Sequence, residues 1–126
     1  MGLVLDSGAM IAFERGDRNV AALIEATRRR REQIVTSSAC VAQAWRRGGP
    51  GQALLARLLG GVNEQGLDRD VSRHVGRLCG QAALNDVVDA HLALLARDGD
   101  AVLTSDADDL RQLLRARGSK ADVRSC

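Results

Sequence analysis

The sequence has 126 residues, of which 45% are hydrophobic and 27% charged, with a formal net charge of +2 at pH 7. This length and composition indicate a folded globular chain that can bury a core without disulfides or metals, and they exclude an intrinsically disordered chain. So small a net charge does not by itself demand a polyanionic partner, so any nucleic-acid interaction must come from local charge.

Cysteine usage and the apolar runs favour a reduced cytoplasmic setting. The three cysteines, Cys40, Cys79 and Cys126, have no short CxxC spacing, and they predict neither a disulfide framework nor a zinc site. The opening MGLVLDSGAM lacks the basic region of a secretory signal, and no apolar run approaches the roughly 20 residues of a membrane helix. We expect a cytoplasmic protein without membrane contact, built as one domain over residues 1–126.

The first half of the chain alternates short strands with helices. Residues 3–5 (LVL) predict a buried strand, and SGAMIAFERGD predicts one or two helical turns that end at Gly16. VAALIEATRRRR has the i, i+3, i+4, i+7 apolar spacing of an amphipathic helix. Residues 33–37 form a second strand, and SACVAQAWRR follows as a helix with Ser37 or Ser38 as its cap. QALLARLL predicts a further helix, with Pro50 near its start.

The second half repeats this alternation. Residues 62–67 predict a short strand or turn, and DRDVSRHVGRLCGQA predicts an amphipathic helix. NDVVDAHLALLARDG reads as a strongly apolar helix that ends at Gly99, before a third buried strand at residues 101–104. ADDLRQLLRARG predicts a helix stopped by Gly118, and ADVRS predicts a final strand. Short apolar strands between helices favour an α/β fold with a parallel sheet covered on both faces.

Aspartates follow two of the three clear strands. Asp6 comes after residues 3–5 and Asp106 after residues 101–104, and parallel sheets place ligands at the carboxyl ends of their strands. Asp86 and Asp89 form an Asp-x-x-Asp pattern at a helix start, which Asp106 repeats with Asp109. Helix capping alone would explain both pairs. Carboxylates gathered in one cleft would instead imply a cation or a shared proton, and spacing alone does not decide between the two.

Three segments carry a resemblance to a known family: VLDSGAMIAFERGD, IVTSSACVAQAWRRGG and VVDAHLALLARDGDAVLTSDADDL. They resemble PIN-domain ribonucleases, and specifically the VapC toxins of bacterial toxin–antitoxin pairs, over nearly the whole chain. The resemblance implies a three-layer α/β/α PIN-like fold with a short, mainly parallel central sheet. It implies an endoribonuclease that depends on Mg²⁺ or Mn²⁺, a homodimer, and a VapB-type antitoxin that lays a helix in a groove and offers a basic side chain to the acidic pocket.

Carried over residue by residue, the resemblance makes Asp6, Asp89 and Asp106 the metal ligands and catalytic acids. The family commonly has a glutamate in a pattern like A-E-x-x-R, where this chain has VAQAWRR with Gln43. The Gln43 amide can still accept a hydrogen bond or orient a water, but it removes one negative charge. The alternative interpretation is therefore a PIN-fold interaction or RNA-binding module whose catalysis is weakened by Gln43.

Four further residues are accessory candidates. Asp109 could reach a metal through water or cap its helix, and Asp86 fits a capping role. Ser7 and Ser105 follow Asp6 and precede Asp106, so their hydroxyls are placed to hydrogen-bond the ligands.

Arginines near the pocket are expected to bind RNA. Arg15 ends the first helix, and Arg46 and Arg47 follow the helix that carries Gln43. Phosphate contacts from such side chains supply most of the affinity of RNA-binding proteins. All three are therefore candidates for contact with the substrate backbone, and the alternative for each is a solvated helix end.

Other conspicuous residues receive no catalytic role. We expect His91 to be a packed or surface residue beside Asp89, and Trp45 to be a core or dimer anchor. A receiver-like or haloacid-dehalogenase-like phosphotransfer domain also uses an aspartate after its first strand. That interpretation fails because no aspartate lies two residues after Asp6, and the only lysine is Lys120, near the end of the sequence.

Overall fold

Five parallel strands form the centre of a computed structural model that describes residues 1–46 and 48–126. Their order across the sheet is β3-β2-β1-β4-β5, and every neighbouring pair is parallel. Leu5 at the end of β1 pairs with Thr36 of β2 and Leu103 of β4, which brings the carboxyl ends of these strands together. The strands are β1 (Leu3–Leu5), β2 (Ile34–Ser37), β3 (Asn63–Gln65), β4 (Ala101–Thr104) and β5 (Asp122–Ser125).

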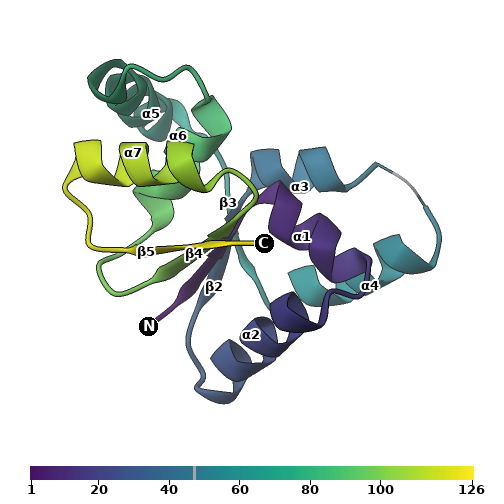
Figure 1. Cartoon of the computed structure of the whole chain (residues 1–126). Helices are drawn as coiled ribbons and strands as arrows, with labels where there is room; N and C mark the ends of the chain where they lie inside the picture. The colour runs from purple at the N-terminus through teal and green to yellow at the C-terminus, as the bar shows by residue number, and fades with distance from the viewer. Residues whose placement is uncertain (47) are drawn as a thin grey trace.

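Helices cover the sheet on both faces, as Figure 1 shows. One group, on the right and lower side of the view, comprises α1 (Ser7–Glu14), α2 (Arg18–Arg29), α3 (Ser38–Ala44) and α4 (Pro50–Leu59). The other group comprises α5 (Arg69–Ala82), α6 (Val87–Leu95) and α7 (Ala107–Arg117). The expected three-layer α/β/α fold with a parallel sheet is therefore confirmed.

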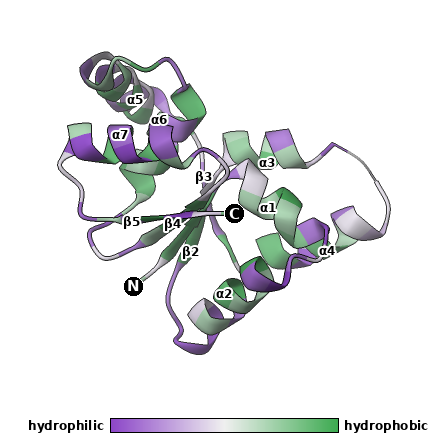
Figure 2. Ribbon diagram, viewed as in Figure 1, coloured by the Kyte–Doolittle hydropathy of each residue, from purple (hydrophilic) through white to green (hydrophobic). Residues whose placement is uncertain are grey.

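The central strands are mainly apolar, because helices cover both of their faces (Figure 2), and the polar residues Thr36, Ser37 and Thr104 lie at their carboxyl ends. Every residue of β1, β2 and β4 is buried, whereas the edge strands β3 and β5 are largely exposed. The apolar stripes of the helices complete the core. Its largest fully buried side chains include Leu3, Leu5, Met10, Ile24, Leu55, Leu58, Leu92, Leu110 and Leu113.

Helix boundaries largely follow the local sequence signals. Ser37 is the N-cap of α3, where its Oγ accepts from the Ala39 N–H at 3.2 Å. Pro50 occupies the first turn of α4, and Gly118 ends α7 in a left-handed conformation with φ of 76°. These three expectations are confirmed.

Two expectations were wrong. Helix α6 ends at Leu95 and not at Gly99, because the Ala96 backbone is extended and the Arg117 guanidinium donates to the carbonyls of Ala93 and Ala96. Trp45 is not a core residue: it is the C-cap of α3, and 44% of its surface is exposed, so of its two expected roles only that of a dimer anchor stays a prediction.

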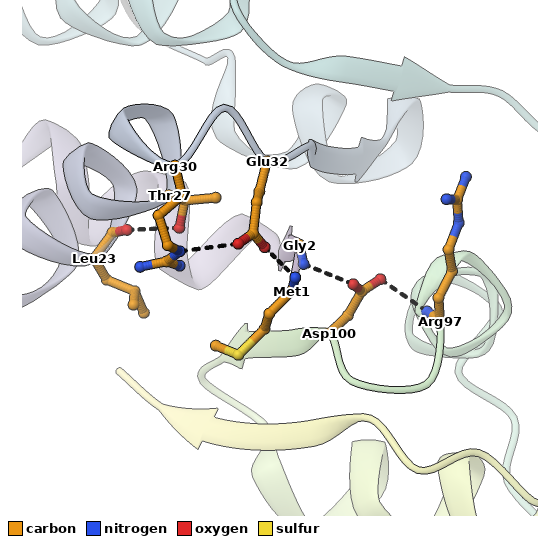
Figure 3. Close-up of polar contacts among 8 residues, drawn as sticks. All are labelled: Met1, Gly2, Leu23, Thr27, Arg30, Glu32, Arg97 and Asp100. Carbon is orange, nitrogen blue, oxygen red and sulfur yellow. Dashed lines mark hydrogen bonds and ion pairs between the residues drawn. The ribbon is translucent and has the colours of Figure 1, made fainter.

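A polar network ties the opposite, amino-terminal end of the sheet together (Figure 3). The Asp100 carboxylate accepts from the Gly2 N–H at 2.8 Å and from the Arg97 N–H at 2.9 Å, which links the start of β1 to the loop before β4. Glu32, ahead of β2, lies against the Met1 amino group and 3.0 Å from the Arg30 Nε. Within the described ranges, no helix is both long and apolar enough to cross a membrane.

Candidate metal centre at the carboxyl ends of the strands

A polar cleft of about 150 Å³ lies where β1, β2 and β4 end and the next helices begin. Side chains from both helical layers line it, so it lies between the two walls of the fold. Four helix amino termini start at this edge, and their unpaired N–H groups favour negative charge. The lining residues are Asp6, Ser7, Cys40, Gln43, Asp86, Val88, Asp89, Ser105 and Asp106.

Asp6 is held by four hydrogen bonds. Its Oδ1 accepts from the Ala9 N–H at 2.7 Å, which caps α1. Its Oδ2 accepts from the Thr104 hydroxyl at 2.6 Å, from the Ser105 N–H at 2.9 Å and from the Ser105 hydroxyl at 3.4 Å. Asp6 is 4% exposed, so this network compensates the burial of its charge. Asp6 therefore binds the end of β4 to the end of β1.

Three other aspartates gather their carboxylates. Oxygens of Asp86, Asp89 and Asp106 all lie within 4.8 Å of one another. Asp86 also caps α6, as the sequence predicts, because its Oδ1 accepts from the Asp89 N–H at 3.0 Å. Asp89 is 7% exposed, and its Oδ2 is fully buried without a hydrogen-bond partner among the described residues. A buried carboxylate oxygen without a donor is the feature that a cation would satisfy.

Asp106 does not cap its helix, although the sequence suggests that it should. It occupies the N-cap position of α7, but its carboxylate accepts no helix N–H. Its own N–H donates to the Thr104 hydroxyl at 2.9 Å, and that hydroxyl in turn donates to Asp6. The Asp106 carboxylate is thus free to face Asp86 and Asp89.

The crowding of these acids disfavours their ionised forms. Burial and the neighbouring carboxylates of Asp86 and Asp106 raise the pKa of Asp89 to about 7. Desolvation and the nearby Asp106 charge also raise the pKa of Asp109. A cluster of this kind holds either a shared proton or a cation, and oxygen-only ligands suit a hard divalent ion.

The ligands that the sequence predicts line one cleft, but their carboxylates contact different groups. Asp89 and Asp106 belong to the three-carboxylate cluster, whose third member is Asp86, which the sequence suggested only as a cap. Asp6 lines the same cleft with its oxygens already bonded to protein donors. Asp109 is half-buried on the first turn of α7 and does not line the cleft.

The remaining candidates divide between the cleft and its surroundings. Gln43 of α3 lines the cleft opposite α6, and its amide makes no hydrogen bond within the described ranges. Ser7 lines the cleft as well, and Ser105 donates to Asp6. Only the Ser105 hydroxyl is seen to bond a candidate ligand, and the role of Ser7 stays a prediction.

Two of the candidate RNA-binding arginines, Arg15 and Arg46, lie outside the acidic cleft. Arg15 lines a neighbouring groove of about 520 Å³ that shares Ser105 with the cleft. Arg46 is exposed, with its Nε donating to the Gln43 carbonyl at 2.9 Å. Arg47 lies outside the described residues.

Residues to which the sequence assigned no role in the site support the cleft. Thr104 is fully buried and connects Asp6 to Asp106 through one hydroxyl. His91 is 1% exposed, and its Nδ1 lies 2.7 Å from the Ser37 Oγ. Burial lowers the pKa of His91, so its ring is neutral at pH 7. Thr104 could have been suspected from its position between a buried strand and Asp106, whereas nothing in the spacing pairs Ser37 with His91.

Gly8 allows the first turn of α1 to lie against Ser105. A Cβ at this position would come 2.3 Å from the Ser105 Oγ and 2.6 Å from its Cβ. We expect Gly8→Ala to destabilise the fold by about 1–3 kcal/mol, because Ser105 would have to move away from Asp6. Urea unfolding would measure this. Gly76→Ala is the matched control, since its Cβ meets open space inside α5, and it should stabilise by about 0.5–1 kcal/mol. If the two changes altered the free energy of unfolding equally, the claim that Ser105 leaves no room for a side chain at position 8 would be wrong.

A comparison with solved structures identifies the fold. The chain superposes on a chain in the crystal structure of VapBC2 from Rickettsia felis bound to a DNA fragment from their promoter, with a TM-score of 0.71. The match covers 100% of this chain and 99% of that chain, at 11% sequence identity. No protein-family model and no curated protein matches the sequence. The likeness therefore concerns the fold, and it agrees with the PIN-like architecture that the sequence motifs imply.

Proposed function

We propose that the chain is a VapC-type PIN-domain toxin, an endoribonuclease that hydrolyses RNA phosphodiester bonds with Mg²⁺ or Mn²⁺ as cofactor. The observation that carries this proposal is the cluster of Asp86, Asp89 and Asp106, with a buried Asp89 oxygen that has no partner within the described ranges. Its position at the carboxyl ends of parallel strands and the full-length fold match to a VapBC2 chain support it.

The cleft fits a hard divalent cation. Asp86, Asp89 and Asp106 would hold it directly, and Asp6 would contribute from the wall formed by β1. When bound, such a cation lowers the pKa of water and acts as a Lewis acid toward the phosphate. The volume of about 150 Å³ suits one ion with its waters and substrate oxygens, so we propose one firmly held metal.

The protein's own groups orient the reactants. The Thr104 and Ser105 donors hold Asp6 in one rotamer. The Gln43 amide, on the wall opposite Asp89, can accept from a water or orient it toward the phosphate. Arg15 beside the neighbouring groove and Arg46 at the end of α3 would contact RNA phosphates, as would Arg47. These cations would offset the repulsion between RNA and the acidic cleft.

The same proposal carries the biological setting. The toxin would act as one domain over residues 1–126 in the cytoplasm, as a homodimer, and a VapB-type antitoxin would inhibit it. The fold match to a chain of VapBC2 from Rickettsia felis, which was solved bound to a DNA fragment from its promoter, supports a partner of this kind.

An RNA cleavage assay tests the proposal. Purified protein should cut total RNA when Mg²⁺ or Mn²⁺ is present and should stop when the metal is chelated. Asp106→Asn should abolish the cut, and because Asp106 is exposed and its backbone N–H keeps its bond to the Thr104 hydroxyl, the variant should fold normally. A clean preparation that cuts no cellular RNA with either metal would refute the enzyme assignment.

The second candidate is a PIN-fold interaction or RNA-binding module weakened by Gln43, and Gln43→Glu separates the two. Restoring a carboxylate opposite Asp89 should strengthen Mn²⁺ binding by about ten-fold, because ligand charge sets the affinity for hard cations. Calorimetry and cleavage rates would be measured together, with Gln43→Ala as the control. An active wild type that Gln43→Glu improves supports the toxin. Cleavage that appears only in Gln43→Glu supports the module.

A further inference from the structure

A buried hydrogen bond joins the two walls of the metal centre at their base. Nδ1 of His91 on α6 lies 2.7 Å from Oγ of Ser37, which ends β2 and caps α3. His91 is 1% exposed and Ser37 is 0% exposed, and 54 positions separate them in the sequence. The bond is therefore a long-range tie inside the fold.

The two residues belong to elements that carry opposite sides of the cleft. Helix α3 brings Cys40 and Gln43 to one side, and the start of α6 brings Asp86 and Asp89 to the other. Among side-chain hydrogen bonds within residues 1–46 and 48–126, this is the bond that connects α6 to the junction of β2 and α3.

The hydrogen positions follow from the partners. Ser37 Oγ already accepts from the Ala39 N–H, so its own proton is free to go to Nδ1 of the imidazole. The ring proton then lies on Nε2, which is buried and has no partner in the part of the chain that the structure describes. Burying an unpaired N–H is unfavourable, and an apolar side chain at position 91 would avoid this cost. Packing alone therefore does not explain the imidazole.

We propose that the Ser37–His91 hydrogen bond is a positioning contact that holds Asp89 in register with Gln43 across the cleft. His91 lies two residues after Asp89 and so about 200° around α6 from it, which means that anchoring His91 fixes the direction in which Asp89 points. Ser37 fixes α3 in the same way through its cap. This inference rests on the proposed function, because it assigns the contact a role in that site.

Two substitutions at position 91 distinguish the effect of the hydrogen bond from the effect of side-chain volume. His91→Leu removes the acceptor and keeps an apolar body, whereas His91→Asn keeps an acceptor near the place of Nδ1. His91→Leu should lower both kcat and the affinity for Mn²⁺ by roughly 10- to 100-fold, the usual effect of losing a residue that orients metal ligands, with KM unchanged. His91→Asn should stay close to wild type in kcat and in Mn²⁺ binding measured by electron paramagnetic resonance.

A third readout depends on neither catalysis nor metal. Trp45 is the single tryptophan of the chain and the C-cap of α3, just beyond Gln43. A shift of α3 should therefore change its emission and its quenching by acrylamide. His91→Leu and Ser37→Ala should show this change, and His91→Asn should not. Leu78→Ala is the control for general destabilisation, because Leu78 is a buried α5 residue outside the cleft.

The outcomes distinguish this inference from the function on which it rests. If wild type neither cuts RNA nor binds Mn²⁺, the proposed function fails, and Trp45 quenching still decides whether the contact holds α3. The inference is overturned if His91→Leu and His91→Asn behave alike in Trp45 quenching, whether or not the protein is active. It is also overturned if Leu78→Ala moves Trp45 as far as His91→Leu does.

Discussion

Asp89→Asn is expected to lose more than about 100-fold of the metal-dependent RNA cleavage, because it removes a ligand charge from the centre of the cluster. The same change should make the metal-free protein more stable than wild type at about pH 8. There the wild-type Asp89 carboxylate is ionised, buried and close to Asp86 and Asp106, and an amide ends that repulsion. Loss of activity with a gain in stability is the behaviour expected of a ligand.

The matched control is Asp108→Asn. Asp108 lies on the first turn of α7 with a side chain that is 99% exposed, outside the three-carboxylate cluster. It should leave cleavage unchanged and the melting temperature of the metal-free protein nearly unchanged, since exposed charges contribute little to stability. If Asp89→Asn unfolds the protein or leaves cleavage intact, the assignment of Asp89 as a ligand is wrong.

The metal-free wild type should lose stability as pH rises from about 4 to about 7. The carboxyl of Asp89 ionises near its ordinary value of 3.8 when unfolded, but its pKa in the folded protein is raised to about 7. The stabilisation that protonated Asp89 gives the folded protein is therefore complete below about pH 4. It falls as pH rises to the folded-state pKa of about 7, and it changes little above that pH. Urea unfolding in a chelating buffer across this range measures the effect.

Two comparisons isolate the source of that pH dependence. In Asp89→Asn the free energy of unfolding should fall less between about pH 4 and about pH 7, because the carboxyl with the raised pKa is gone. Saturating Mg²⁺ should stabilise the wild type at about pH 8, by about 2.7 kcal/mol at a free concentration one hundred times the dissociation constant. If the free energy of unfolding of the metal-free wild type increased steadily up to pH 8, the claim that crowding disfavours the ionised acids would be wrong.

The fold could be predicted from local patterns because each buried strand contains a short run of apolar residues that ends in small polar ones or an aspartate. Residues 3–5, 33–37 and 101–104 are recognisable without their neighbours, and their parallel pairing follows from the helices between them. The end of α6 could not be placed in this way. Gly99 offered a stop signal, but the helix ends earlier, at Leu95, through Arg117, a residue about twenty positions away in the sequence.

Only part of the site could be predicted from the sequence in the same way. The position of Asp6 and Asp106 after strands brought them to one edge of the sheet, and the family resemblance added Asp89. Sequence spacing assigned Asp86 to capping, and the structure shows that a capping carboxylate can also face two others. The Thr104 hydroxyl and the Ser37–His91 contact depend on how chain segments far apart in the sequence meet, which no local pattern reports.

A titration of the metal-free protein with Mn²⁺ at about pH 8, where Asp89 is ionised, is the most direct test of the central claim. We expect saturable binding of one ion to the wild type, and its loss in both Asp89→Asn and Asp106→Asn. Binding that persists unchanged in these variants, or a wild type that binds no Mn²⁺, would contradict a metal centre formed by these aspartates.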